Sequence, residues 1–122
     1  MHSQQAPLPV GAYPHARRVG QLLFLSGIGP RQRADNTIPD GIEAQCHAVF
    51  QNVRYVLEEA GSRWENLVDV TVFLTHMARD FETYNRLYAT YFRDNQPCRT
   101  TVEISSLPTP IAIELKCIAT VG

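Results

Sequence analysis

Apolar residues recur at helical spacing in a first segment that runs from Ile42 to Ala60. Asp40 precedes this segment and Glu43 follows three residues later, which predicts an N-cap pair in the manner of a capping box. Gly61 then supplies a C-terminal stop signal. The pattern predicts an amphipathic helix whose apolar face carries Ile42, Cys46, Val49, Val53, Val56, Leu57 and Ala60.

A second helix is predicted after Asp80, which is placed as its N-cap. It ends before Gln96 and Pro97, because a helix does not continue into the residue that precedes a proline. Its apolar stripe is aromatic and consists of Phe81, Tyr84, Tyr88 and the pair Tyr91 and Phe92.

Strands are predicted at residues 22–28, 67–74, 99–104 and 111–120. The first is a short apolar run that ends in Ser-Gly and enters a loop over residues 29–41, and a Pro-rich loop at 107–110 precedes the last. The segment 67–74 alternates, with Val68, Val70, Val72 and Leu74 on one face.

The predicted order is one or more strands, helix, strand, helix, strand, strand, which indicates an α+β domain. Two helices cover only one face of such a sheet, so the other face is exposed unless the protein oligomerises. The last strand directs Ile111, Ile113, Leu115 and Cys117 to one side and Ala112, Glu114, Lys116 and Ile118 to the other. Charged residues among apolar neighbours on the second face suggest a subunit interface that contains a polar site.

Composition narrows the class of protein. The 122 residues fit a single domain over 1–122, with Pro7 and Pro9 predicting an extended or frayed start over residues 1–9. With 11 basic and 12 acidic residues and no basic stripe, nucleic acid is not an expected partner. The longest apolar run, Leu22–Leu25, is far below the ~20 residues of a membrane helix, and no secretory leader is expected. Three widely spaced cysteines favour reduced thiols in the cytoplasm over disulfides or a metal site.

Two charged residues could carry chemistry, and each has a purely structural alternative. Arg99 follows Pro97-Cys98 at a strand start, where its guanidinium suits a carboxylate or forms a structural ion pair. Glu114 lies mid-strand among apolar residues, where it is either a salt-bridge partner of Lys116 or a general acid/base with a tuned pKa. Tyr13 and His15, which flank Pro14, are either packing residues or part of a site.

Several motifs together resemble one family. They are Gly11-Ala-Tyr13, Leu25-Ser-Gly27, Phe81-x-x-Tyr-Asn85, and above all Pro97-Cys-Arg-Thr-Thr-Val-Glu103 with Leu107-Pro108 and Ile113-Glu114. Nearly the whole chain in this way resembles the Rid family of enamine/imine deaminases, also called the YjgF or L-PSP endoribonuclease family. Gly11-Ala-Tyr-Pro-His-x-Arg-Arg18 and Ser26-Gly-x-x-x-Arg31 are most similar to the 2-aminomuconate deaminase branch.

The resemblance implies a chorismate-mutase-like fold, in which a mixed β-sheet is backed by two helices on one face. It also implies a homotrimer with a central barrel and sites in the clefts between subunits. No cofactor or metal is implied. Matched positions assign carboxylate binding to Arg99, water activation to Glu114, and pocket positions to Tyr13, Ser26 and Asn85. Thr101 occupies a position where many members have Cys, and Lys116 one where a second acidic residue is common.

Three functions remain open at this point. The leading hypothesis is hydrolytic deamination of a small carboxylate-bearing enamine or imine to a 2-oxo acid. The others are a non-enzymatic trimer that binds a small carboxylate, and an endoribonuclease, which the neutral charge disfavours. Arg17, Arg18 and Arg31 lie near the matched pocket segments. One of them, with Arg18 or Arg31 preferred, is hypothesised to bind a distal carboxylate such as that of 2-aminomuconate, and the alternative is that all three are surface residues.

Overall fold

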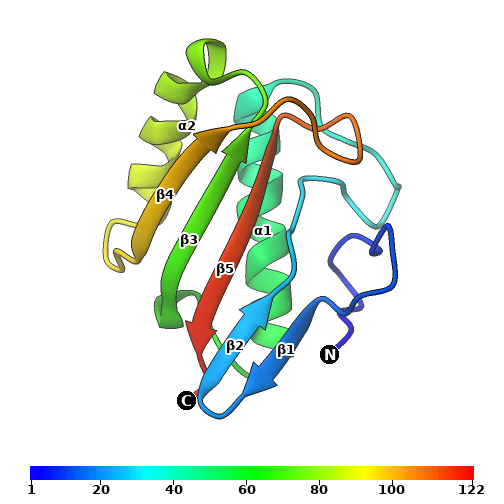
Figure 1. Cartoon of the computed structure of the whole chain (residues 1–122), viewed down its shortest axis with the longest axis vertical. Coiled ribbons are helices and arrows are strands. Elements are labelled where there is room, and N and C mark those ends of the chain that lie inside the picture. Colours follow the sequence, from blue (N-terminus) through cyan, green and yellow to red (C-terminus); the bar gives the residue numbers. More distant parts are fainter.

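A computed structural model describes all 122 residues and contains one five-stranded mixed sheet (Figure 1). Its strand order is β1-β2-β5-β3-β4. Strands β3 and β4 pair in parallel and the other neighbours are antiparallel. The strands are β1 (Ala16–Val19), β2 (Leu22–Leu25), β3 (Leu67–Leu74), β4 (Cys98–Glu103) and β5 (Ile113–Thr120).

Both long helices lie on the same face of this sheet (Figure 1). Helix α1 (Ile42–Glu59) packs against β5 and against α2 (Met77–Tyr91), and a short 3₁₀ turn, η1 (Trp64–Asn66), follows α1. The α+β class, the mixed sheet and the one-sided helix coverage are therefore confirmed. No helix is long and apolar enough to cross a membrane.

The core lies between the helices and one face of the two central strands. Alternate residues of β3 and β5 are buried there, as the sequence pattern predicts, namely Val70, Val72, Leu74, Ile113, Leu115 and Cys117. Val68 is the exception: the register between β3 and β5 shifts between Leu67 and Asp69, so Leu67 is buried and Val68 is exposed. The placement of Val68 on the buried face is therefore wrong.

Both predicted helix caps are also wrong. Helix α1 begins after Gly41, whose φ of +86° favours glycine, and Asp40 makes no capping hydrogen bond. Helix α2 begins at Met77, three residues before Asp80. The Met77 backbone N–H donates instead to Glu103 Oε1 over 2.8 Å, because the end of β4 brings that carboxylate to the helix.

The first predicted strand is interrupted by a bulge. Strand β2 ends at Leu25, and Ile28 rejoins the sheet by exchanging two backbone hydrogen bonds with Leu115. Phe24 is opposite Ile118 and Ile28 is opposite Leu115, so β2 contains one residue more than β5 over this stretch. The bulge directs Ser26 and Gly27 away from regular pairing.

Of the two forms expected for residues 1–9, extended or frayed, the start of the chain is not frayed. The Met1 ammonium donates to the Ala16 carbonyl, and Ser3 and Ala6 are buried. Ser3 Oγ accepts the N–H groups of Gln5 and Ala6 and donates to Glu59 at the end of α1. These long-range bonds, which sequence periodicity does not reveal, hold the segment in place.

We expect Ser3→Ala to lower the free energy of unfolding by about 1–2 kcal/mol, because buried backbone N–H groups lose their acceptor. Urea denaturation followed by circular dichroism measures this difference. Gln5→Ala, at an exposed neighbouring side chain, is the matched control and should change stability by less than about 0.5 kcal/mol. Equal stability of the two variants would contradict the account of the N-terminus.

Candidate functional site

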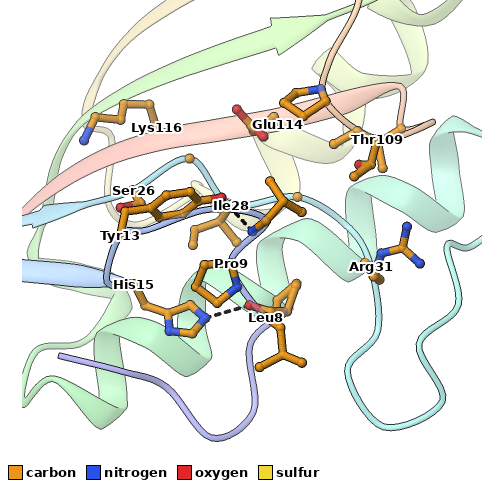
Figure 2. A pocket seen from close by; sticks show the side chains of 16 residues that line it. Leu8, Pro9, Tyr13, His15, Ser26, Ile28, Arg31, Thr109, Glu114 and Lys116 are labelled. Atoms are coloured by element: carbon orange, nitrogen blue, oxygen red, sulfur yellow. Dashed lines mark hydrogen bonds between the residues drawn. The ribbon is translucent and has the colours of Figure 1, made fainter.

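A cavity of about 450 Å³ lies beside the bulge in β2 (Figure 2). It is bounded by the bulge, by the segment of residues 7–10, which we call the strap, and by the loop before β5. Glu114 and Lys116 of β5 form another wall (Figure 2). Its polar side chains are those of Tyr13, His15, Ser26, Arg31, Thr109, Glu114 and Lys116.

Glu114 is the carboxylate of this cavity. Alternation along β5 buries Ile113 and Leu115 among the helices and turns Glu114 to the open face, where it is half-buried. Its side chain forms no ion pair, and Lys116 donates instead to the Leu25 carbonyl, so of the two alternatives left open for Glu114 the salt bridge with Lys116 is not formed. Desolvation by burial raises the pKa of Glu114 above its ordinary value.

Gly27 provides the space that this carboxylate occupies. A Cβ atom at position 27 would lie 2.6 Å from Glu114 Oε2 and 2.9 Å from its carboxyl carbon. Any other residue would therefore displace the Glu114 side chain. The Ser-Gly signal that ends the apolar run in the sequence corresponds to this close approach.

The expected pocket residues Tyr13 and Ser26 lie in the same cavity (Figure 2). Tyr13 Oη accepts a hydrogen bond from the Val10 N–H over 3.1 Å. Ser26 Oγ donates to the Pro14 carbonyl over 2.6 Å. Each side chain is thus oriented by the backbone of the segment that leads into β1.

Of the three arginines near these segments, only Arg31 lines the cavity. Its Nη1 donates to the Asn36 carbonyl over 3.0 Å, and the residue is half-buried. Arg18 lies on β1 and donates to the Gly20 carbonyl of its own hairpin, and Arg17 is exposed on the same strand. The structure therefore places Arg31 with Glu114 and separates Arg18 from both.

Arg99, Asn85 and Thr101 form a second cluster, between β4 and α2. Arg99 Nη1 donates to Asn85 Oδ1 over 2.8 Å, and its guanidinium carbon lies 4.8 Å from the Tyr88 ring centroid and 5.4 Å from that of Tyr84. Thr101 Oγ1 and Tyr84 Oη are 2.7 Å apart and hydrogen-bonded.

Sequence reasoning assigned Tyr84 and Tyr88 to the core stripe of α2 and missed their contact with Arg99. Burial raises the pKa of both phenols, and the Arg99 charge opposes part of that rise. Tyr88 Oη has no hydrogen-bond partner although it is buried. The i, i+4 spacing of the two tyrosines, with Asn85 between them, is the only sequence signal for this contact of two rings with Arg99.

The two clusters lie on opposite faces of the sheet. Arg99 is paired with Val70, and Val70 with Cys117, so Arg99 is on the helix side of the sheet while Glu114 is on the open side. Glu114 lies three residues along β5 from Cys117, which is in register with Arg99, and β5 is two strands away from β4. The backbone positions of Glu114 and Arg99 are therefore roughly 14 Å apart in the sheet. One chain therefore does not bring Arg99 and Glu114 together.

Two of the three cysteine thiols are buried, and the possible metal ligands are dispersed. No group of three or more His, Cys, Asp or Glu side chains could hold a metal ion. Cys46 and Cys117 are buried, and desolvation raises the pKa of each thiol to about 12. Such thiols remain protonated at neutral pH and are poor nucleophiles.

Comparison with known proteins identifies the family. The family model described as Endoribonuclease L-PSP matches residues 3–121. The chain belongs to this family, also known as the RutC or Rid family. A RutC family protein of Pyrococcus abyssi is 37% identical over 118 residues, which is 96% of this chain and 92% of the relative.

Two further relatives have informative names. Reactive Intermediate Deaminase A, chloroplastic, of Arabidopsis thaliana is 34% identical over an alignment that covers 97% of this chain and 63% of the Arabidopsis protein. The crystal structure of Escherichia coli TdcF with bound serine superposes with a TM-score of 0.93 at 28% identity, over 99% of this chain and 97% of that one. The L-PSP fold is thus shared closely along the whole chain.

Titration of Glu114 should appear in the pH dependence of stability. Because burial raises the folded-state pKa above the unfolded value, the folded state binds this proton more tightly. The resulting stabilisation is complete below the unfolded pKa of about 4.5 and is lost as pH rises through the raised folded pKa. We expect the free energy of unfolding, measured by urea denaturation, to decline between pH 4 and pH 7 in the wild type because of this group, and Glu114→Gln to remove that decline. Glu65→Gln, at an exposed glutamate, is the control and should follow the wild type. Equal pH profiles for the wild type and Glu114→Gln would contradict the assignment.

Proposed function

We propose that the protein is a hydrolytic deaminase that converts 2-amino enamine or imine carboxylates into 2-oxo acids and ammonia. The observation that carries the proposal is the half-buried Glu114, which faces a cavity without an ion-pair partner and has a raised pKa. A carboxyl group tuned toward neutral pH can both accept and donate a proton. The deaminase name of the Arabidopsis relative points to the same chemistry.

Arg99 would bind the carboxylate next to the imine carbon. Asn85 accepts one of its hydrogen bonds and the Tyr88 ring lies against the guanidinium, which leaves the other N–H groups to bind a carboxylate. A bidentate contact of this kind fixes the position of the reacting carbon. Serine bound to the related TdcF supports a site for a small amino carboxylate.

Glu114 would carry the proton steps. The enamine first tautomerises to the imine, and a water molecule then adds to the imine carbon as Glu114 accepts one of its protons. Glu114 returns the proton to the nitrogen of the resulting carbinolamine. Glu114 then carries the hydroxyl proton of the carbinolamine to the nitrogen as the carbon–nitrogen bond breaks, so ammonia leaves and the carbinolamine oxygen becomes the 2-oxo group.

The active site would be assembled from two copies of the chain in a homotrimer with a central barrel. Arg99 and Glu114 lie on opposite faces of the sheet, so Arg99 of one copy must meet Glu114 of another. A head-to-tail contact that closes into a ring repeats this pairing at every interface. The open face carries half-buried Phe24, Phe73 and Ile118, which suit burial against a neighbour.

The specific substrate proposed is 2-aminomuconate, a six-carbon diacid. Arg31 lines the cavity that holds Glu114, where it could bind a distal carboxylate.

The three free cysteines, with Cys98 exposed, favour a reducing compartment such as the cytoplasm.

Arg99→Ala should lower kcat/KM for deamination on the order of a hundredfold or more, because a desolvated charge-assisted contact is worth about 2–5 kcal/mol. Ammonia release from 2-aminoacrylate measures the rate, and light scattering should still report a trimer. Arg93→Ala, at another exposed arginine, is the control.

Glu114→Gln should lose turnover while still binding carboxylate. Wild-type turnover in either site variant would overturn the proposal.

Arg31→Ala should raise KM for 2-aminomuconate by one to two orders of magnitude, the scale of about one charge-assisted contact. Activity on 2-aminoacrylate, which has no distal carboxylate, should change little. Arg18→Ala removes an arginine outside the cavity and is the matched control for both substrates. Equal losses on both substrates, or no loss on either, would indicate a general imine deaminase instead.

A further inference from the structure

Asn52 is a buried amide on the apolar side of helix α1. It is only 4% exposed, and the buried residues of the helix around it include Val49, Val53 and Val56. Asn is a weak helix former, and burial of its amide costs free energy unless the hydrogen bonds of the amide are made. A polar side chain at this position therefore has to meet a specific requirement.

The amide of Asn52 donates twice to one short segment. Its Nδ2 donates to the Gly29 carbonyl over 2.9 Å and to the Arg31 carbonyl over 2.9 Å. Carbonyl oxygens can only accept, so the nitrogen of the amide must face them and the orientation of the side chain is determined. Asn52 in this way connects the core helix to residues 29–31, which follow the bulge of β2.

The segment of residues 29–31 has few other attachments. Its backbone makes no hydrogen bonds besides the two from Asn52. Regular pairing ends at Ile28, which bonds to Leu115, and resumes at Gln32, whose N–H donates to the Thr37 carbonyl. Burial of the proline at position 30 holds the segment against the core. The two bonds from Asn52 determine the direction in which its carbonyl groups point.

This segment also forms a wall of the cavity that contains Glu114. Gly29 and Arg31 both line that cavity (Figure 2). A Cβ atom at Gly29 would lie 3.0 Å from Ile111 Cδ1, so the segment passes close to the loop before β5. The Arg31 guanidinium forms no ion pair, and its one hydrogen bond goes to the Asn36 carbonyl. Its place in the cavity thus depends on the backbone from which it extends.

We propose that Asn52 is a positioning residue for Arg31, and that it thereby sets the preference of the cavity for ligands with a second, distal carboxylate. A guanidinium makes two parallel bonds to a carboxylate only within a narrow range of positions. Removal of the Asn52 amide lets residues 29–31 turn, which moves the guanidinium out of that range. The inference rests on the proposed function for the class of ligand, and its structural part is tested without a ligand.

A matched pair of ligands separates the role of Arg31 from the rest of the cavity. Hexa-2,4-dienedioate carries two carboxylates, and hexa-2,4-dienoate has the same carbon chain with only one. Isothermal titration calorimetry with the full-length protein gives a Kd for each. Arg31→Ala should weaken binding of the dienedioate alone. Asn52→Ala should raise the dienedioate Kd about three- to tenfold, the scale of one hydrogen bond, and the dienoate Kd by less than about twofold.

Asn95→Ala is the matched control for the loss of an amide that bridges two carbonyls. Asn95 Nδ2 donates to the Trp64 carbonyl over 3.1 Å and to the Leu67 carbonyl over 3.3 Å, and none of these residues lines the cavity. This variant should leave the ratio of the two Kd values unchanged. Asn52→Ser, whose side chain is too short to bridge both carbonyls, repeats the test if Asn52→Ala does not fold.

A double-mutant cycle distinguishes positioning of Arg31 from a general structural role. In an Arg31→Ala background, Asn52→Ala should leave the dienedioate Kd unchanged, because no guanidinium remains to be positioned. A purely structural role would instead raise the Kd by the same factor in both backgrounds.

The motion of Arg31 gives a readout that needs no ligand. The ¹⁵N order parameters of its backbone N–H and of its side-chain Nε–H should fall in Asn52→Ala and stay at the wild-type values in Asn95→Ala.

Equal weakening of both ligands in Asn52→Ala, the same factor in the two backgrounds, or unchanged Arg31 order parameters would overturn the role of Asn52. A preference for the dienedioate that survives in Arg31→Ala would contradict the distal-carboxylate site of the proposed function, and so would failure of both ligands to bind the wild type. Either result would also overturn the ligand preference assigned to Asn52, and the order parameters would still decide whether Asn52 positions Arg31.

Discussion

Side-chain alternation across the sheet divides the charged residues of this protein between two environments. On β5, residues that point toward the helices build the core, so the residue between Ile113 and Leu115 must point the other way. That residue is Glu114, and burial on the open face raises its pKa. On β4 the same rule places Arg99 on the helix side, over two tyrosine rings of α2. A single chain consequently holds Arg99 and Glu114, the two residues of the proposed site, apart.

The bulge in β2 makes room for Glu114 beside its neighbouring strand. A regular strand would place a side chain against the carboxylate, whereas the bulge presents Gly27, which has none. The same bulge directs Ser26 toward Pro14, which orders the segment containing Tyr13. Strand irregularity, glycine and cavity are therefore parts of one arrangement around one carboxylate.

The fold class could be predicted because it depends on periodicity, which the sequence displays directly. Alternation placed Ile113 and Leu115 correctly, and helical spacing located both helices. The helix caps could not be predicted, because the group that satisfies the start of α2 is Glu103, 26 residues further along the chain. The exposure of Val68 could not be predicted either, because it follows from the shift in the pairing register of β3 with β5, which no local pattern encodes. At the candidate site, motif resemblance selected Glu114, Tyr13, Ser26 and Arg31, which share a cavity, but it contained no information on which face each strand would present.

The central claim is that Arg99 and Glu114 act together only across two copies of the chain. Co-expression of Arg99→Ala and Glu114→Gln subunits, each expected to be inactive alone, tests it most directly through ammonia release from 2-aminoacrylate by the purified hybrids of the proposed trimer. Each mixed trimer, of either composition, places an intact Arg99 beside an intact Glu114 at one of its three interfaces, so about a third of wild-type activity should return in the hybrids. Hybrids as inactive as the parent variants would contradict the claim, because a site contained within one chain cannot be restored by mixing.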